Sequence, residues 1–183
     1  MDNSPTAILQ DLQAVLKEHP LPPVHKWHPE QTRESRMRIT SNGDWFYQDS
    51  KIDRMRMVRM FASILRKDDD EYYLVTPVER LRIDVADAPF IAVLLTVTQQ
   101  NGRPQMVFTT NMGDEVIADA NHRICIEYSH AEADPSPYIE VRNGLRALMS
   151  RSVYYQMAEL AERNEGQLGV FSNGCFMALA EAG

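Results

Sequence analysis

Residues 36–47 read RMRITSNGDWFY, and this stretch carries the strongest β-hairpin signal in the chain. The pair Asn42-Gly43 lies at its centre. On both sides of the pair, apolar side chains occupy every second position: Met37, Ile39, Trp45 and Tyr47. Alternation with a period of two around a short turn is typical of two antiparallel strands. Because Asn-Gly tolerates two positive φ angles, we predict a type I′ turn at this pair.

Similar turns punctuate the rest of the chain. Four of the eight glycines follow asparagine, and we predict a turn at each pair: Asn42-Gly43, Asn101-Gly102, Asn143-Gly144 and Asn173-Gly174. Short apolar or alternating patterns between the turns favour strands over residues 72–75, 78–85, 90–97, 106–109, 124–128, 138–141, 168–171 and 175–179. Residues 90–97 are almost continuously apolar, so we predict a central strand there that is buried on both faces.

Three segments show the period of an α-helix. Residues 4–16 combine a Ser-Pro start with apolar positions at spacings of three and four, and the proline-rich residues 19–30 that follow favour an extended conformation. Residues 53–66 have an apolar stripe formed by Val58, Phe61, Ile64 and Leu65. Residues 145–163 have the inward positions Met149, Val153, Met157 and Leu160.

The order of these elements indicates the fold class. Antiparallel hairpins interrupted by helices indicate an α+β fold rather than a parallel βαβ sheet. The rhythm of strands, helix and hairpin appears twice, and the turn at residues 40–44 (TSNGD) is echoed at residues 110–114 (TNMGD), which suggests an internal duplication. We therefore predict duplicated antiparallel-sheet-plus-helix units. The expected organisation is an N-terminal helix and proline-rich segment (residues 1–30), a first half (residues 31–86) and a second half (residues 87–183).

Composition excludes several classes of protein. A chain of 183 residues with 44% apolar and 25% charged residues is typical of a globular protein and excludes a disordered or collagen-like one. The net charge of -7 repels a phosphate backbone, so we expect no general nucleic-acid binding. Charge is nevertheless uneven along the sequence, because residues 33–66 carry eight Lys or Arg against four Asp or Glu, a net charge of +4. This positive segment is either a local anion site or a solvated face balanced by acidic residues elsewhere.

The two cysteines and the apolar runs bear on the cellular compartment. Cys125 and Cys175 lie in apolar stretches without redox or zinc spacing, so we expect both to be small core residues. No secretory signal pattern and no apolar run long enough to span a membrane occurs. We therefore expect a cytoplasmic protein without a membrane span.

No motif of high specificity for catalysis or metal binding is present. The phosphate-loop, dinucleotide, zinc-protease and nucleophile-elbow patterns are all missing from the sequence. His25 and His28 have a metal-like spacing, but a proline-rich extended segment does not place them on one face. We therefore predict no catalytic residue, no metal site and no cofactor.

A set of aromatic and cationic residues gives the more suggestive signal. Its members can stack on a base and bind a phosphate, or they can fill cores and brace helices. The set comprises Trp45, Tyr47, Arg54, Arg56, Arg59, Arg142, Arg146, Arg151, Tyr154 and Tyr155. Arg54 lies at the start of the first predicted helix of the two halves and Arg142 lies just before the second. Unpaired N–H groups at these starts favour an anion, so both arginines could converge on one phosphate.

Several stretches taken together resemble the bacterial family known as domain of unknown function 1285. They extend from about residue 28 to the C-terminus and are GDWFY (residues 43–47), MVRMFA (57–62), YLVTPVE (73–79), DAPF (87–90), TN (110–111), VRNGL (141–145) and GVFSNG (169–174). The resemblance implies a duplicated core, a loose likeness of the C-terminal half to pleckstrin-homology folds, and a ligand site at the interface of the halves. For this family a nucleotide-based ligand and a signalling role have been suggested, without an established activity.

These observations lead to one functional hypothesis and two alternatives. We expect a regulatory protein that binds a small anionic, nucleotide-like ligand through Trp45, Tyr47, Arg54, Arg59, Asp87, Asn111, Arg142 and Arg151. The first alternative is an enzyme that acts on a phosphorylated metabolite with Asp87 or Glu79 as general base. The second is a module that binds a protein partner through its pleckstrin-like half.

Overall fold

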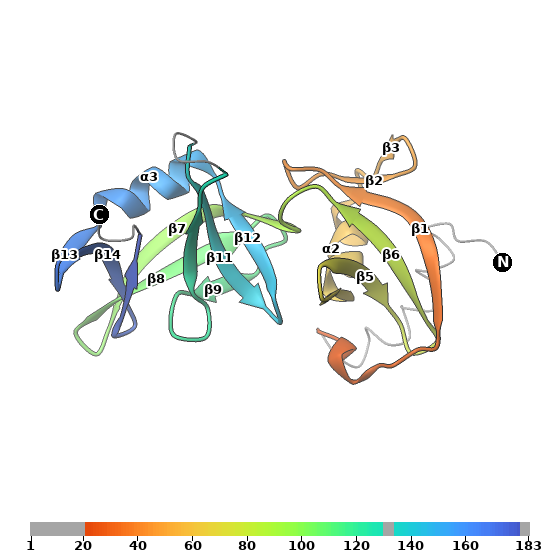
Figure 1. Ribbon diagram of the computed structural model, residues 1–183, viewed down its shortest axis with the longest axis horizontal. Coiled ribbons are helices and arrows are strands. Elements are labelled where there is room, and N and C mark those ends of the chain that lie inside the picture. The colour runs from red at the N-terminus through yellow and green to blue at the C-terminus, as the bar shows by residue number, and fades with distance from the viewer. Residues whose placement is uncertain (1–20, 130–133, 180–183) are drawn as a thin grey trace. The chain divides into compact units, whose positions relative to one another are not determined.

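The computed structural model describes residues 21–129 and 134–179. The chain divides into two compact units at Asp87 and Ala88, and each unit contains a six-stranded sheet (Figure 1). The helix that the sequence predicts at residues 4–16 lies outside the described residues. Within the described ranges no helix has the length and apolar character needed to cross a membrane.

The first unit is a mixed sheet that curls around one helix (Figure 1). Its strand order is β3-β2-β1-β6-β5-β4, with β1 parallel to β6 and the other neighbours antiparallel. The short 3-10 helix η1 (Val24–Lys26) precedes the sheet, within a segment predicted to be extended. The other elements are β1 (Gln31–Ile39), β2 (Trp45–Tyr47), β3 (Ser50–Lys51), α2 (Met55–Ser63), β4 (Leu65–Asp68), β5 (Glu71–Val75) and β6 (Glu79–Val85).

Helix α2 is shorter than the sequence predicts. Its buried positions Val58, Phe61 and Ala62 follow the spacing of three and four, and the ring of Phe61 stacks on Trp45 with the centroids 6.2 Å apart. The predicted continuation to residue 66 is wrong, because Leu65 begins strand β4 and pairs with Leu74. An apolar run of this length is compatible with a helix or a strand, and here pairing with β5 makes residues 65–68 a strand.

The second unit has a mixed sheet followed by a helix and a small three-stranded sheet. Its strand order is β10-β11-β12-β7-β8-β9, with β7 parallel to β12, and the small sheet has the order β13-β14-β15. The elements are β7 (Phe90–Gln100), β8 (Arg103–Thr110), β9 (Glu115–Ile117), β10 (Ile124–Glu127), β11 (Ser136–Arg142), β12 (Leu145–Met149), α3 (Arg151–Glu159), β13 (Glu162–Asn164), β14 (Gln167–Ser172) and β15 (Cys175–Ala178).

The segment predicted as one helix over residues 145–163 forms a strand and a shorter helix. Burial alternates along β12, where Leu145, Ala147 and Met149 are buried, and this period of two belongs to a strand. Ser150 then starts α3 as its N-cap. Leu160, predicted to point inward, follows the end of the helix and is 41% exposed.

Two further predictions about burial are wrong. Strand β7 is not buried on both faces, since Val93, Leu94 and Val97 are exposed. Its pairing with β12 covers only Phe90–Ala92, so the later residues lack a strand neighbour on that side. Cys125 is exposed on the terminal strand β10 and Cys175 is half-buried on β15, so neither is a core residue.

The two units repeat one strand order, which confirms a duplicated architecture. Numbered within its own unit, each sheet has the order 3-2-1-6-5-4, and its first and sixth strands are parallel. The sheets are therefore mixed rather than purely antiparallel as predicted. Parallel pairing joins segments that are far apart in sequence, so no local pattern reports it. The helix differs in position, because α2 lies between the third and fourth strands and α3 follows the sixth.

The two TxxGD turns share their hydrogen bonds but not their place in the sheet. In each turn the threonine N–H donates to the aspartate carbonyl, over 2.9 Å at residues 40 and 44 and 2.8 Å at residues 110 and 114. The first turn joins strands one and two of its unit, and the second joins strands two and three. Gly43 has a φ of 80°, whereas Asn42 does not have a positive φ. The predicted type I′ turn is therefore wrong, and a three-residue turn with a left-handed glycine replaces it.

Candidate functional site

A pocket of about 310 Å³ in the second unit contains the predicted residue Arg151. Two aromatic side chains of α3, Tyr154 and Tyr155, lie in its wall with the ends of β11 and β12. The volume is at the lower end of the range for small-molecule sites. The lining residues are Asp134, Pro135, Ser136, Pro137, Leu148, Met149, Arg151, Tyr154 and Tyr155.

The start of α3 positions the cationic side of this pocket. Strand β12 ends where the Ser150 N–H donates to the carbonyl of Ala92 over 3.0 Å. The Ser150 hydroxyl then accepts from the Val153 N–H at 3.4 Å and caps the helix. Arg151 is thereby fixed at the first helical position, next to backbone N–H groups that carry partial positive charge. Arg151 and the start of α3 therefore both bring positive charge to the lining of the pocket.

Two tyrosines form the aromatic side of the pocket. The ring centroids of Tyr154 and Tyr155 are 5.9 Å apart with an interplanar angle of 46°. Burial and the nearby Tyr128 and Tyr155 raise the pKa of Tyr154 above its ordinary value of 10.0. Its phenol therefore remains a neutral hydrogen-bond donor at physiological pH. Tyr155 is 61% exposed, so its ring face is open to a planar ligand.

The charge on Arg151 is not neutralised within the part of the chain that the structure describes. No carboxylate there forms an ion pair with it, and no acidic residue lies in the first turn of α3. Asp134 is the acidic residue among those lining the pocket. A guanidinium beside two tyrosines can bind a phosphate or carboxylate while a ring stacks against the aromatic faces.

Arg142 and Asn111, two other predicted site residues, each contact the start of β7. Arg142 Nη1 donates to Asp114 Oδ2 over 3.0 Å, and its Cζ lies 5.0 Å from the ring centroid of Phe90. Asn111 Oδ1 accepts from the Ile91 N–H over 3.0 Å. The expectation that Arg142 precedes a helix is wrong, because β12 separates it from α3. Arg142 is therefore not adjacent to the N-terminus of α3, where backbone N–H groups would attract an anion.

The predicted site residues of the first unit have different environments. Trp45 is 1% exposed, and its buried Nε1 has no hydrogen-bond partner among the described residues. Tyr47 is half-buried at the end of β2. Arg54 and Arg59 are exposed at the N-cap and in the middle of α2. Asp87 is half-buried at the last position of the first unit.

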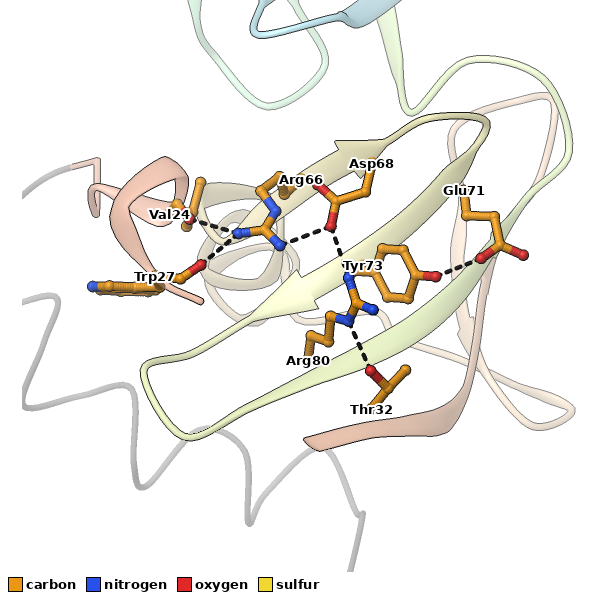
Figure 2. Close-up of polar contacts among 8 residues, drawn as sticks. All are labelled: Val24, Trp27, Thr32, Arg66, Asp68, Glu71, Tyr73 and Arg80. Carbon is orange, nitrogen blue, oxygen red and sulfur yellow. Dashed lines mark hydrogen bonds and ion pairs between the residues drawn. The ribbon is translucent and has the colours of Figure 1, made fainter. Parts of the chain in front are cut away.

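A network of hydrogen bonds and ion pairs in the first unit connects the segment around η1 with strands β4 and β6 (Figure 2). Arg66 Nη1 donates to the carbonyls of Val24 at 2.9 Å and Trp27 at 2.7 Å, while its Nη2 lies 2.7 Å from Asp68. Arg80 joins the same carboxylate at 3.2 Å. These contacts hold the segment around η1 against β4, and the buried Nε of Arg66 has no hydrogen-bond partner among the described residues.

One of the two carboxylates proposed as a catalytic base takes part in an ion pair. Glu79 lies 3.5 Å from Arg33 in an ion pair between β6 and β1. Across residues 21–129 and 134–179, no cluster of three or more His, Cys, Asp or Glu side chains could hold a metal ion.

The second unit has a further concave surface that sequence patterns did not indicate. This pocket, of about 710 Å³, is lined by Ile124, Cys125, Ile126, Tyr128, Gln167, Ala178 and Leu179. Its described lining residues carry no charge, and three of them belong to the terminal strand β10.

Sequence reasoning identified part of the 310 Å³ pocket and missed the rest. Arg151, Tyr154 and Tyr155 belong to the aromatic and cationic set, but the prolines and Met149 were not recognised. The signal that could have placed α3 is Ser150 after the alternating Leu145, Ala147 and Met149. No local signal connects residues 134–137 to that helix.

Comparisons with known proteins cover nearly all of the described chain. Residues 22–88 match the model of the N-terminal domain of DUF1285, a domain of unknown function, and residues 89–179 match its C-terminal domain. The crystal structure of a DUF1285 family protein from Silicibacter pomeroyi DSS-3 is 41% identical, with a TM-score of 0.84 over 93% of both chains. A DUF1285 family protein from Shewanella baltica OS155 is 30% identical, with a TM-score of 0.54, over 67% of this chain and 90% of that one. No curated protein matches. The chain therefore belongs to the DUF1285 family.

Proposed function

We propose that this is a cytoplasmic regulatory protein that binds a small anionic, nucleotide-like ligand in the 310 Å³ pocket of its second unit. One observation carries the proposal: Arg151, without an ion-pair partner among the described residues, shares this pocket with Tyr154 and Tyr155. In this role Arg151 binds the phosphate, and the tyrosine rings contact the base or sugar. The volume favours a ligand the size of one nucleotide.

We extend the proposal to the kind of module that holds the ligand. The second unit has six strands followed by α3, and this order supports the loose pleckstrin-homology likeness expected for it. The pocket uses the start of that helix together with the β11–β12 hairpin. Regulation would then act through ligand-dependent stabilisation of the second unit.

Thermal melting of the full chain tests this function. The probes are ATP, GTP, AMP, cyclic mononucleotides, cyclic dinucleotides and inorganic phosphate. Because a ligand that binds only the native state stabilises it, a concentration of about 100 times Kd adds roughly 2.7 kcal/mol. This raises Tm by about 5 to 10 °C in a protein of this size.

Two variants and one control make the test specific. Arg151→Gln and Tyr155→Ala remove the phosphate and ring contacts at exposed positions, so we expect the ligand-induced shift to fall strongly in both. Arg163→Gln removes an equally exposed arginine from β13, outside the pocket, and should keep the shift. A panel without any saturable shift in the unsubstituted protein would contradict the proposal.

A further inference from the structure

The outer side of α2 in the first unit carries three exposed arginines, Arg54, Arg56 and Arg59. We call these residues the basic face of α2. Arg56 and Arg59 lie one turn apart, away from the stripe of Val58 and Phe61 that packs into the core.

The basic face has no ion-pair partner among the described residues. None of its three arginine side chains forms an ion pair, a cation–π contact or a hydrogen bond with the described residues. By contrast, Arg66, Arg80 and Arg82 of the same unit each pair with a carboxylate. No acidic residue lies in the first turn of α2, where the helix dipole favours one.

An exposed apolar side chain accompanies these charges. Met55 is 45% exposed and lies one turn before Arg59. Arginine and methionine are both enriched in the surfaces that proteins use to bind one another. The combination is typical of a contact surface with an electrostatic and an apolar component.

We propose that the basic face of α2 docks an acidic segment of a partner protein. Charge complementarity argues for this occupant, because three guanidinium groups on a chain of net charge -7 form a local positive surface. Each guanidinium can bind an Asp or Glu side chain through two N–H groups. The site is on the first unit and does not depend on the nucleotide pocket of the second.

Other anionic occupants fit these observations less well. A nucleic acid is disfavoured by the net charge of -7. A bilayer surface usually requires more basic residues and an apolar helix face, whereas the apolar face of α2 is buried in the core. A small anion prefers a concave site, and the outer side of a helix is convex.

The experiment measures binding of a fluorescein-labelled peptide of alternating Glu and Ala to the full chain by fluorescence anisotropy. At low ionic strength we expect saturable binding that weakens as salt is added. The triple variant Arg54→Gln, Arg56→Gln, Arg59→Gln should bind about tenfold more weakly, because each exposed ion pair contributes modestly. The matched control Arg103→Gln, Arg123→Gln, Arg163→Gln removes the same charge from exposed positions of the second unit and should bind within about twofold of the unsubstituted protein.

Several results would overturn the docking proposal. The first is the absence of peptide binding, and the second is an equal loss of peptide affinity in both triple variants. The third is binding of an oligonucleotide, phosphatidylserine vesicles or inorganic phosphate that depends on α2, without binding of the peptide. Melting of both variants within about 3 °C of the unsubstituted protein verifies that the exposed substitutions preserve the fold. None of these results would change the ligand-induced shift in melting temperature expected from the pocket of the second unit. The two proposals are therefore tested separately.

Discussion

Arg142 and Asp114 form an ion pair in which Nη1 lies 3.0 Å from Oδ2, and this pair joins the end of β11 to the turn between β8 and β9. The Arg142 side chain is 19% exposed and also covers the ring of Phe90. A residue held on two sides in this way braces the sheet, so its removal should affect stability more than ligand binding.

Arg142→Gln should therefore lower the free energy of unfolding by about 1 kcal/mol, after allowance for partial solvent screening of the pair. Urea denaturation measures this change. Asp114→Asn should have a similar effect, and the double variant should lose less than the sum of the two. Full additivity would show that the pair does not couple these strands.

Gly43→Val should destabilise the first unit. Gly43 has a φ of 80°, and a β-branched residue is strained in that region. We expect a loss of about 1 to 2 kcal/mol, measured by thermal melting. Gly43→Asn is the control, because asparagine adopts left-handed conformations more readily, and it should lose clearly less. Equal melting temperatures for the Val variant and the unsubstituted protein would contradict the turn geometry.

Arg66→Met should loosen the segment around η1. The substitution removes the donors to the carbonyls of Val24 and Trp27 and leaves Asp68 with Arg80 as its remaining ion-pair partner among the described residues (Figure 2). Loss of charged hydrogen bonds at a side chain that is 13% exposed should cost about 2 to 3 kcal/mol. Urea denaturation gives the stability, and trypsin cleavage at Lys26 should accelerate.

Lys67→Met, on the neighbouring position of β4, is the matched control for Arg66→Met. It removes a cation without breaking a contact to η1, so cleavage at Lys26 should keep its original rate. Unchanged cleavage in Arg66→Met as well would show that the network does not restrain the segment.

Asp119 should give the protein an acid-dependent contribution to stability. Burial raises the pKa of Asp119, but hydrogen bonds from the N–H groups of Asn121 and His122 and from the His122 ring outweigh burial and hold the pKa below its ordinary value of 3.8. Because the folded pKa is depressed, the stabilisation is present above the unfolded value and is lost as pH falls through the folded one.

The difference in melting temperature between the unsubstituted protein and Asp119→Asn should thus be largest near neutral pH and shrink below about pH 4. Asp70→Asn, at an exposed position in the β4–β5 turn, should show no such difference at any pH. A difference in melting temperature between the unsubstituted protein and Asp119→Asn that stays constant down to pH 2 would rule out the proposed role of the Asp119 carboxylate.

Local patterns predicted the α+β class and most of the strands, but not how the strands pair. Three of the four Asn-Gly pairs have positive φ at both residues, as the turn chemistry predicts, and Asn42-Gly43 is the exception. The parallel pairs β1–β6 and β7–β12 join segments separated by the whole of a sheet, so they depend on tertiary packing.

The candidate site was also predictable only in part, because tertiary packing decides which of its residues come together. Arg151 and Tyr155 have residue types that suit an anionic aromatic ligand, whereas the pairing of Arg142 with Asp114 needs the fold to bring β11 to the β8–β9 turn. The error over residues 145–149 arose because Leu145 and Met149 are four residues apart, which also fits a helix. The pairing of residues 145–149 with β11 and β7 makes them a strand, and their burial alternates because successive side chains of a strand point to opposite faces of the sheet.

Calorimetric titration with the nucleotide that gives the largest thermal shift tests the nucleotide pocket most directly. Arg151→Gln should weaken binding by about 1.5 to 3 kcal/mol, the range for a hydrogen bond to a charged group, while its melting temperature without ligand stays close to that of the unsubstituted protein. Arg142→Gln should melt earlier and bind with unchanged affinity. Binding by Arg151→Gln that equals that of the unsubstituted protein, or no heat of binding with any nucleotide tested, would contradict a nucleotide site at the start of α3.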